Sequence, residues 1–266
     1  RHILRFGVAL LGLRITTGDV MDLGWPVVAL IVGSVVATIL AGGLIGRMFG
    51  LKGDQSILSA GSVAICGASA ALAIASVLPT HKDSERNTIL TVAGVTALST
   101  VAMVAYPVFV TYLGYDNATA GVFLGATIHD VAQVVGAGYI ISDQTGEIST
   151  LVKLIRVACL VPVVVTISLI MHRRRSPDAH GQPLLPWFLV AFVVLVLVNS
   201  FGWVPDTVQS ALTPVSSWCL LTAVAALGVK TSLKALADVG PKPVAVMVLQ
   251  TVFLAAFVIG GVALIG

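Results

Sequence analysis

The chain has 266 residues, of which 57% are hydrophobic and only 10% are charged, and its mean hydropathy is +1.02. Soluble domains carry about 25% charged residues, so this composition excludes a soluble globule. A membrane-crossing helix needs about 20 apolar residues, and apolar runs recur along the whole chain, which predicts a polytopic all-α membrane protein with about nine helical segments. The net charge of +3 is small, and we expect no nucleic-acid partner.

The predicted helices, in chain order, cover residues 3–17, 26–46, 57–78, 88–113, 118–141, 152–171, 185–203, 208–229 and 243–265. We expect them to form a single transmembrane domain over residues 1–266. Their continuously apolar character excludes the short alternating strands of a membrane β-barrel. The first helix is short, and the chain begins with Arg1 rather than Met, so we expect N-terminal helices to be missing.

Positive charge predicts the orientation of the bundle, because cytoplasmic loops are enriched in Lys and Arg. The clearest marker is the loop with Arg173, Arg174 and Arg175, which we place in the cytoplasm. Alternation of the helices then puts further basic residues on the same side, namely Arg1, Arg5, Arg47, Lys52, Lys230, Lys234 and Lys242. Lys82 and Arg86 fall on the opposite side as exceptions, unless one of the segments is re-entrant.

The three cysteines lie inside apolar runs and lack the paired spacing of metal ligands. The chain also lacks a phosphate-binding GxxxxGK[ST] loop and the HExxH and CxxC motifs. We therefore expect no metal, no cofactor and no ATP-driven pump, and we do not expect an enzyme.

An internal repeat relates the two ends of the chain. Residues 9–24 read ALLGLRITTGDVMDLG, and residues 225–240 read AALGVKTSLKALADVG. With an odd number of helices between them, the copies would point in opposite directions, as in the inverted-topology repeats of secondary transporters. The alternative is a chance alignment of short strings rich in Ala, Leu and Gly.

A segment of small residues, 61–71, reads GSVAICGASAA. Its glycines allow a membrane helix to unwind locally, and a broken helix frees backbone N–H groups whose positive dipole end suits an anion. The alternative is ordinary packing, because small residues also let membrane helices approach closely. The candidate substrate-binding residues here are Gly61, Ser62, Cys66, Gly67 and Ser69.

A second segment, 125–138, reads GATIHDVAQVVGAG and places His129 and Asp130 inside an apolar run. An Asp at the centre of a membrane helix costs roughly 3 kcal/mol, so it should face the interior of the bundle. A histidine titrates near neutrality, and the pair could carry a coupling proton, or Asp130 could hold a sodium ion. Gln133 shares a helix face with His129 and is a candidate for substrate binding. The alternative is a structural pair bonded to neighbouring helices.

Five further polar residues lie in or near apolar segments. Lys153 and Arg156, at the mouth of the next helix, could attract an anionic substrate, or could simply reach out to lipid headgroups. For Asn199, Ser200 and Gln250, hydrogen bonding between helices is a sufficient explanation.

These segments, together with KLIRV at residues 153–157, closely resemble the YeiH-type bacterial inner-membrane proteins. The resemblance runs over essentially the whole chain, and it implies an exporter of sulfate. The family is similar in design to the bile acid/sodium symporters, which implies that residues 61–71 and 125–138 belong to two discontinuous helices that cross near the substrate.

The sequence thus favours a secondary active transporter that moves a small anion, with sulfate or a related sulfur oxyanion as first choice, by alternating access with proton or sodium coupling. An uncoupled anion channel or uniporter and a sodium-coupled organic-anion symporter are the alternatives. A more remote one is an intramembrane hydrolase with Ser69 or Cys66 as nucleophile and His129 as base. The expected partners are the anion, the lipid bilayer and a second copy of the chain.

Overall fold

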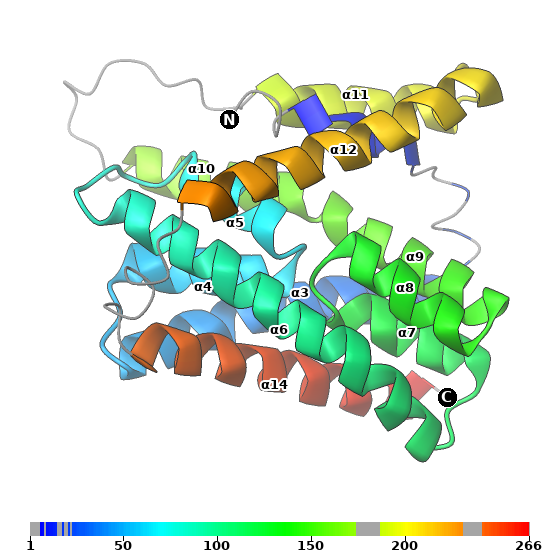
Figure 1. Ribbon diagram of the computed structural model, residues 1–266, viewed down its shortest axis with the longest axis horizontal. Coiled ribbons are helices and arrows are strands. Elements are labelled where there is room, and N and C mark those ends of the chain that lie inside the picture. Colours follow the sequence, from blue (N-terminus) through cyan, green and yellow to red (C-terminus); the bar gives the residue numbers. More distant parts are fainter. Residues whose placement is uncertain are drawn as a thin grey trace.

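The computed structural model describes residues 6–7, 9–14, 18, 21, 23–173, 187–230 and 241–265, and every regular element in this part of the chain is helical. Figure 1 shows the long helices side by side with their axes in roughly the same direction. The elements are η1 (Leu11–Arg14), α3 (Trp25–Met48), α4 (Gly53–Ala64), α5 (Ala68–Ala75), α6 (Ser84–Tyr112), α7 (Asn117–Thr127), α8 (Val131–Ile141), α9 (Asp143–Ala158), α10 (Leu160–Arg173), α11 (Trp187–Ser200), α12 (Asp206–Lys230) and α14 (Pro241–Ile265).

Four helices within the described residues are long and apolar enough to cross a membrane: Trp25–Met48, Ser84–Tyr112, Asp143–Met171 and Pro241–Ile265. The third consists of α9 and α10, which are interrupted at Cys159. Pro162 explains the interruption, because it has no N–H to donate to the carbonyl one turn earlier. Their outer faces carry exposed apolar side chains such as Leu40, Val104 and Val252, as expected of a surface covered by lipid. The prediction of a polytopic all-α membrane protein is confirmed.

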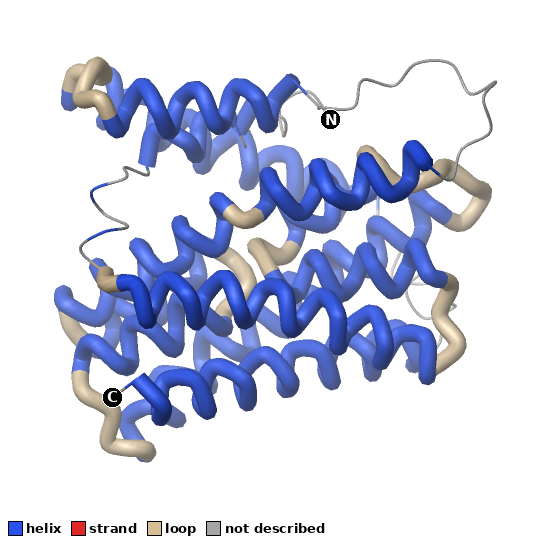
Figure 2. The backbone as a smooth tube through the Cα atoms, turned by 180° about the vertical axis from the view of Figure 1, so that it is seen from behind, coloured by secondary structure: helices blue, strands red, loops and turns tan. Residues whose placement is uncertain are grey.

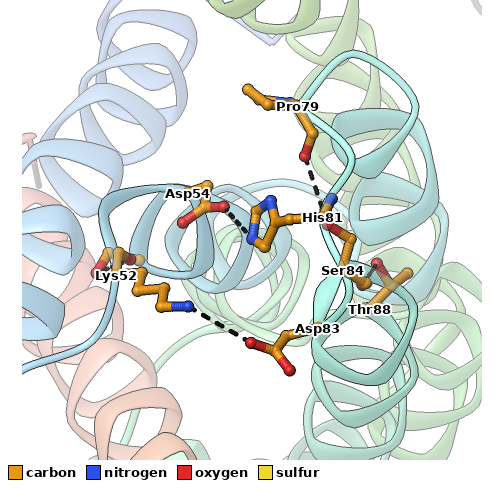
Figure 3. A network of polar contacts seen from close by, with 8 residues as sticks. Lys52, Asp54, Pro79, His81, Asp83, Ser84 and Thr88 are labelled. Carbon is orange, nitrogen blue, oxygen red and sulfur yellow. Dashed lines mark hydrogen bonds and ion pairs between the residues drawn. The ribbon is translucent and has the colours of Figure 1, made fainter.

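The segment predicted as one helix over residues 57–78 is instead a helical hairpin, α4 and α5, which we call hairpin 1. Lys52 Nζ, just before α4, lies 3.4 Å from the carboxylate of Asp83, which directly precedes α6. His81 Nε2 also lies 2.7 Å from Asp54 Oδ2, so the two ends of the segment meet (Figure 3). A continuous helix of this length would hold its ends about 30 Å apart. Hairpin 1 therefore enters and leaves the bundle on the same side.

Residues 118–141 also form a hairpin, α7 and α8, which we call hairpin 2. The Thr145 hydroxyl, just after α8, donates to the carbonyl of Asn117 at the start of α7 over 3.1 Å. Asp116 caps α7, because its carboxylate accepts a hydrogen bond from the backbone N–H of Thr119. This bond lowers the pKa of the Asp116 carboxyl. Because α6 crosses the bundle between the two hairpins, they enter from opposite sides (Figures 1 and 2).

The two hairpins correct one prediction and leave another open. Both segments are discontinuous, as predicted, but each reverses its direction at the break instead of continuing across the membrane. Their opposite orientations are those that an inverted-topology repeat requires. The repeat predicted between residues 9–24 and 225–240 stays a prediction, because residues 231–240 and part of the first copy lie outside the described residues.

Glycines allow the hairpins to pack closely on the long helices. A Cβ at Gly125 or Gly138 of hairpin 2 would collide with Ser149 of α9. On the other side of the bundle, a Cβ at Gly42 of α3 would meet Ala60 of hairpin 1 at 2.8 Å. Small residues in these segments therefore serve packing, as the alternative interpretation held, and that packing brings the two hairpin tips to the centre.

Candidate functional site

The tips of the two hairpins, residues 65–67 and 128–130, meet in the interior of the bundle. Gly67 has a φ of +64°, which reverses the chain in hairpin 1 and which L side chains rarely adopt. A Cβ at this position would lie 3.3 Å from the Cβ of His129 in hairpin 2. The backbone N–H of Asp130 donates to the Ser99 hydroxyl of α6 over 3.0 Å, which fixes the second tip against that helix.

Two cations of α9 bind the tips from one side. Lys153 Nζ donates to the carbonyls of Ile65 and Ile128, each over 2.8 Å, so one ammonium group joins both hairpins. The Arg156 guanidinium donates in the same way to three carbonyls, those of Ala64 at 2.7 Å, Val63 at 2.6 Å and Ile128 at 3.2 Å. Both side chains have 0% exposure.

This arrangement corrects the prediction for Lys153 and Arg156. They lie neither at a mouth nor among headgroups, but near the middle of the long span 143–171. The last carbonyls of a helix lack partners within that helix and carry the negative end of its dipole. Because α4 and α7 both end inside the bundle, a donor with positive charge is what these ends require. The i,i+3 spacing places both cations on the same face of α9.

The charge of this region is not balanced by the contacts of its cations. The side-chain hydrogen bonds described for Lys153 and Arg156 all go to backbone carbonyls, which carry no full negative charge. Asp130 lies close enough to act electrostatically on Lys153. Two cations and one carboxylate leave an excess of positive charge, which favours an anion in the same place.

The structure divides the predicted residues of hairpin 1 into two groups. Cys66 Sγ lies 2.8 Å from the Ser69 hydroxyl, and both flank the turn at Gly67. Gly61 and Ser62 lie within α4: a Cβ at Gly61 would collide with Ile74 of α5, and the Ser62 hydroxyl donates to Leu58 of its own helix. Packing explains this second pair.

The start of α5 provides donors at the tip of hairpin 1. Its N-cap residue Gly67 offers no side chain to the first-turn N–H groups. These groups carry the positive end of the α5 dipole, and they lie beside the excess positive charge of Lys153 and Arg156. The prediction of an anion held by freed N–H groups is therefore compatible with the geometry of this tip.

In hairpin 2 the structure brings the predicted residues together with hydroxyl groups that sequence reasoning missed. His129 Nε2 lies 3.1 Å from the Thr251 hydroxyl of α14. Gln133 Nε2 donates to the Thr100 hydroxyl of α6 over 2.9 Å. In the described part of the chain, His129 Nδ1 and Gln133 Oε1 are buried without a hydrogen-bond partner. A buried polar atom without a partner is costly, so each is a candidate contact for a ligand.

Two predictions of interhelical hydrogen bonds are confirmed. Gln250 Nε2 donates to the carbonyl of Gly42 over 3.0 Å and to the Ser59 hydroxyl over 3.1 Å, and Asn199 Nδ2 donates to the carbonyl of Leu13 over 3.0 Å. For Ser200 the described bond differs from the prediction, because its hydroxyl donates to the carbonyl of Val196 in its own helix over 2.7 Å. The missed residues Ser99, Thr100 and Thr251 carried a weak signal, since each is a hydroxyl in the middle of an apolar run. Such hydroxyls usually bond to their own helix, and only the packing shows which ones reach a neighbouring segment.

Comparison with known proteins relates this chain to a family. The family described as conserved hypothetical protein 698 matches residues 1–247. The chain is 54% identical to a UPF0324 membrane protein of Chlorobaculum tepidum over 98% of its own length and 73% of the relative. It is 50% identical to the UPF0324 membrane protein TauZ of Paracoccus denitrificans over 100% of its length and 80% of the relative. No solved structure matches the chain.

Proposed function

We propose that this chain, which belongs to the UPF0324 family of membrane proteins, is a secondary transporter for a small anion. The observation that carries the proposal is the meeting of two oppositely oriented hairpin tips at two buried cations, Lys153 and Arg156. Helix ends that meet near the midplane are where secondary transporters bind substrates and coupling ions. The excess positive charge selects for an anion.

The proposed binding residues are those at the tips. The N–H groups at the start of α5, with Cys66 and Ser69, contact the anion from hairpin 1, and His129 and Gln133 contribute from hairpin 2. The carboxylate of Asp130 offsets part of the positive charge. Lys153 and Arg156 hold the tips and supply the charge. We propose sulfate or a related sulfur oxyanion as the substrate and the bacterial inner membrane as the location. No metal or organic cofactor takes part.

We propose alternating access as the mechanism, and the same geometry supports it. Hairpin 1 opens toward one side of the membrane and hairpin 2 toward the other. A small displacement of either tip would expose the anion to only one side. The hydrolase alternative requires His129 within reach of Ser69 or Cys66, whereas the hydrogen bonds of the described residues pair Cys66 with Ser69 and His129 with Thr251.

Flux in reconstituted vesicles tests this proposal. Purified protein in liposomes is given radiolabelled sulfate, with sulfite and taurine as competitors, with and without imposed pH and sodium gradients. We expect saturable uptake and counterflow, both lost in Arg156→Met and retained in Lys82→Met, an exposed matched control. Linear, unsaturable conductance would identify a channel, and absence of flux with folded protein would overturn the assignment to sulfur anions.

A further inference from the structure

The hydrogen bonds around His129 determine which of its ring nitrogens carries the proton. The Thr251 hydroxyl donates its single hydrogen to the carbonyl of Met247 over 2.9 Å, because a carbonyl can only accept. The same hydroxyl oxygen lies 3.1 Å from His129 Nε2. With that hydrogen directed at Met247, the oxygen accepts from the ring, and we therefore assign the hydrogen of the neutral imidazole to Nε2.

The other ring nitrogen is consequently an acceptor that has nothing to accept. A neutral imidazole has one N–H, so a hydrogen on Nε2 leaves a lone pair on Nδ1. His129 is 0% exposed, and its Nδ1 has no partner among the described residues. The carbonyl of Val63, at the end of α4, lies beside the ring and is also an acceptor. Two acceptors, Nδ1 and this carbonyl, are then close together without a hydrogen between them. A proton on Nδ1 would make it a donor to the carbonyl of Val63.

Because of the charges that face His129, binding of a proton at Nδ1 depends on whether an anion is bound. Lys153 and Arg156 of α9 act on the ring and oppose a third positive charge. Asp130 lies beside it in the same tip, Cys66 belongs to the opposite tip, and α14 presents the neutral side chain of Thr251. An anion bound at the tips offsets the two cations. Anion binding therefore favours the proton, and by linkage the proton favours the anion to the same degree.

We infer that His129 Nδ1 takes up the coupling proton together with the anion, so that the protein is a proton–anion symporter. This inference rests on the proposed function and specifies its coupling ion. The doubly loaded state, with proton and anion on the same tips, is the one that changes access. A proton gradient then drives the anion in the direction of the proton, and export along this route requires an outward anion gradient large enough to exceed it.

Calorimetry on the full chain in detergent tests the inference without transport. Sulfate, sulfite and taurine are titrated at neutral pH in two buffers of different ionisation enthalpy, and the difference in heat gives the protons taken up. We expect about one proton for each anion bound by the wild type. His129→Gln should bind anion with almost no proton uptake, and Lys82→Met, at an exposed cation outside the site, should retain it.

A second pair of variants tests the tautomer if His129→Gln does not fold. Thr251→Val removes the acceptor for Nε2, so the neutral ring can move its hydrogen to Nδ1 and donate to the carbonyl of Val63. Proton uptake should then fall well below the wild-type value. Thr251→Ser retains the hydroxyl and should retain the uptake.

The outcomes separate this inference from the proposed function. Anion binding without proton uptake in the wild type would overturn the inference and leave the anion transporter standing, as would full uptake in folded His129→Gln. Absence of binding heat from sulfate and sulfite, the two anions, would overturn the anion site itself. Loss of uptake in His129→Gln and Thr251→Val, with Lys82→Met and Thr251→Ser unchanged, supports the inference.

Discussion

Arg156 shows how one side chain can determine the position of two segments. Its guanidinium bonds carbonyls of both hairpin tips, those of Val63, Ala64 and Ile128. Guanidinium offers five N–H donors in a rigid plane, and it stays charged when buried. A lysine in its place could not reach three carbonyls in this geometry.

Loss of Arg156 should therefore destabilise the protein. In Arg156→Met, the carbonyls of Val63 and Ala64 lose their described side-chain partner, and each buried carbonyl left unpaired costs about 1–3 kcal/mol. We expect thermal unfolding in detergent to begin several degrees lower. Lys82→Met, at an exposed cation, should leave the curve unchanged. Equal curves for the two variants would contradict a structural role for the guanidinium.

Asp130 contributes to the balance of charge at the same site. Its carboxylate attracts the Lys153 ammonium group and offsets part of the positive charge of the two cations of α9. In Asp130→Asn the region becomes more positive, so we expect tighter anion binding, slower release and impaired net transport in a protein that still folds. Equilibrium binding and turnover, measured on the same preparation, check this. Wild-type flux and wild-type affinity together would remove Asp130 from the mechanism.

At the scale of the element, the breaks were visible in the sequence but their direction was not. Gly61, Gly67 and the His129–Asp130 pair indicate interrupted helices, because glycine and buried polar residues disfavour a plain apolar helix. The reversal at each break depends on contacts between distant residues, such as Lys52 with Asp83 and Thr145 with Asn117. Hydropathy measures only whether a segment is apolar, so a hairpin and a spanning helix of equal length give the same signal.

Gly67→Ala tests the turn of hairpin 1. The left-handed conformation costs an L residue about 1–2 kcal/mol, and the added Cβ would press on His129 of the other tip. We expect lower stability and a strong loss of transport. Gly50→Ala is the matched control, because Gly50 also has a positive φ but has no atom within 4 Å of an added Cβ. If both variants lose transport equally, the contact between the tips has no functional role.

At the scale of the whole molecule, the hairpins change the predicted topology. Because hairpin 1 returns to its side of entry, Lys82 and Arg86 lie on the same side of the bundle as Lys52. Their placement on the opposite side, expected from nine alternating helices, is thus wrong. The correction strengthens the charge asymmetry, because all three basic residues then lie on the side that α10 approaches with Arg173.

Cysteine accessibility checks this topology. In a cysteine-free background, Lys52→Cys and Lys82→Cys should react with a membrane-impermeant thiol reagent from the same side, which the positive charge predicts to be the cytoplasm. Asp143→Cys, at the base of hairpin 2, should react only from the other side. Reaction of Lys52→Cys and Lys82→Cys from opposite sides would contradict hairpin 1 and support a single membrane-spanning helix over residues 57–78.

The sequence by itself determined the class of the protein and most of the residues at its centre. Continuous apolar runs require helices in a bilayer, because only internal hydrogen bonds satisfy the backbone there. His129, Asp130, Lys153 and Arg156 stood out because a polar group inside such a run is costly and needs a reason.

The tertiary structure decided what those residues touch. Lys153 and Arg156 donate to backbone carbonyls at the tips of the two hairpins, whereas sequence reasoning had placed them at the mouth of a helix. The hydroxyl of Thr251 lies beside the ring of His129. Such contacts join segments about a hundred residues apart in the chain. The local sequence pattern does not predict these contacts, because they depend on how helices of equal hydropathy pack against one another.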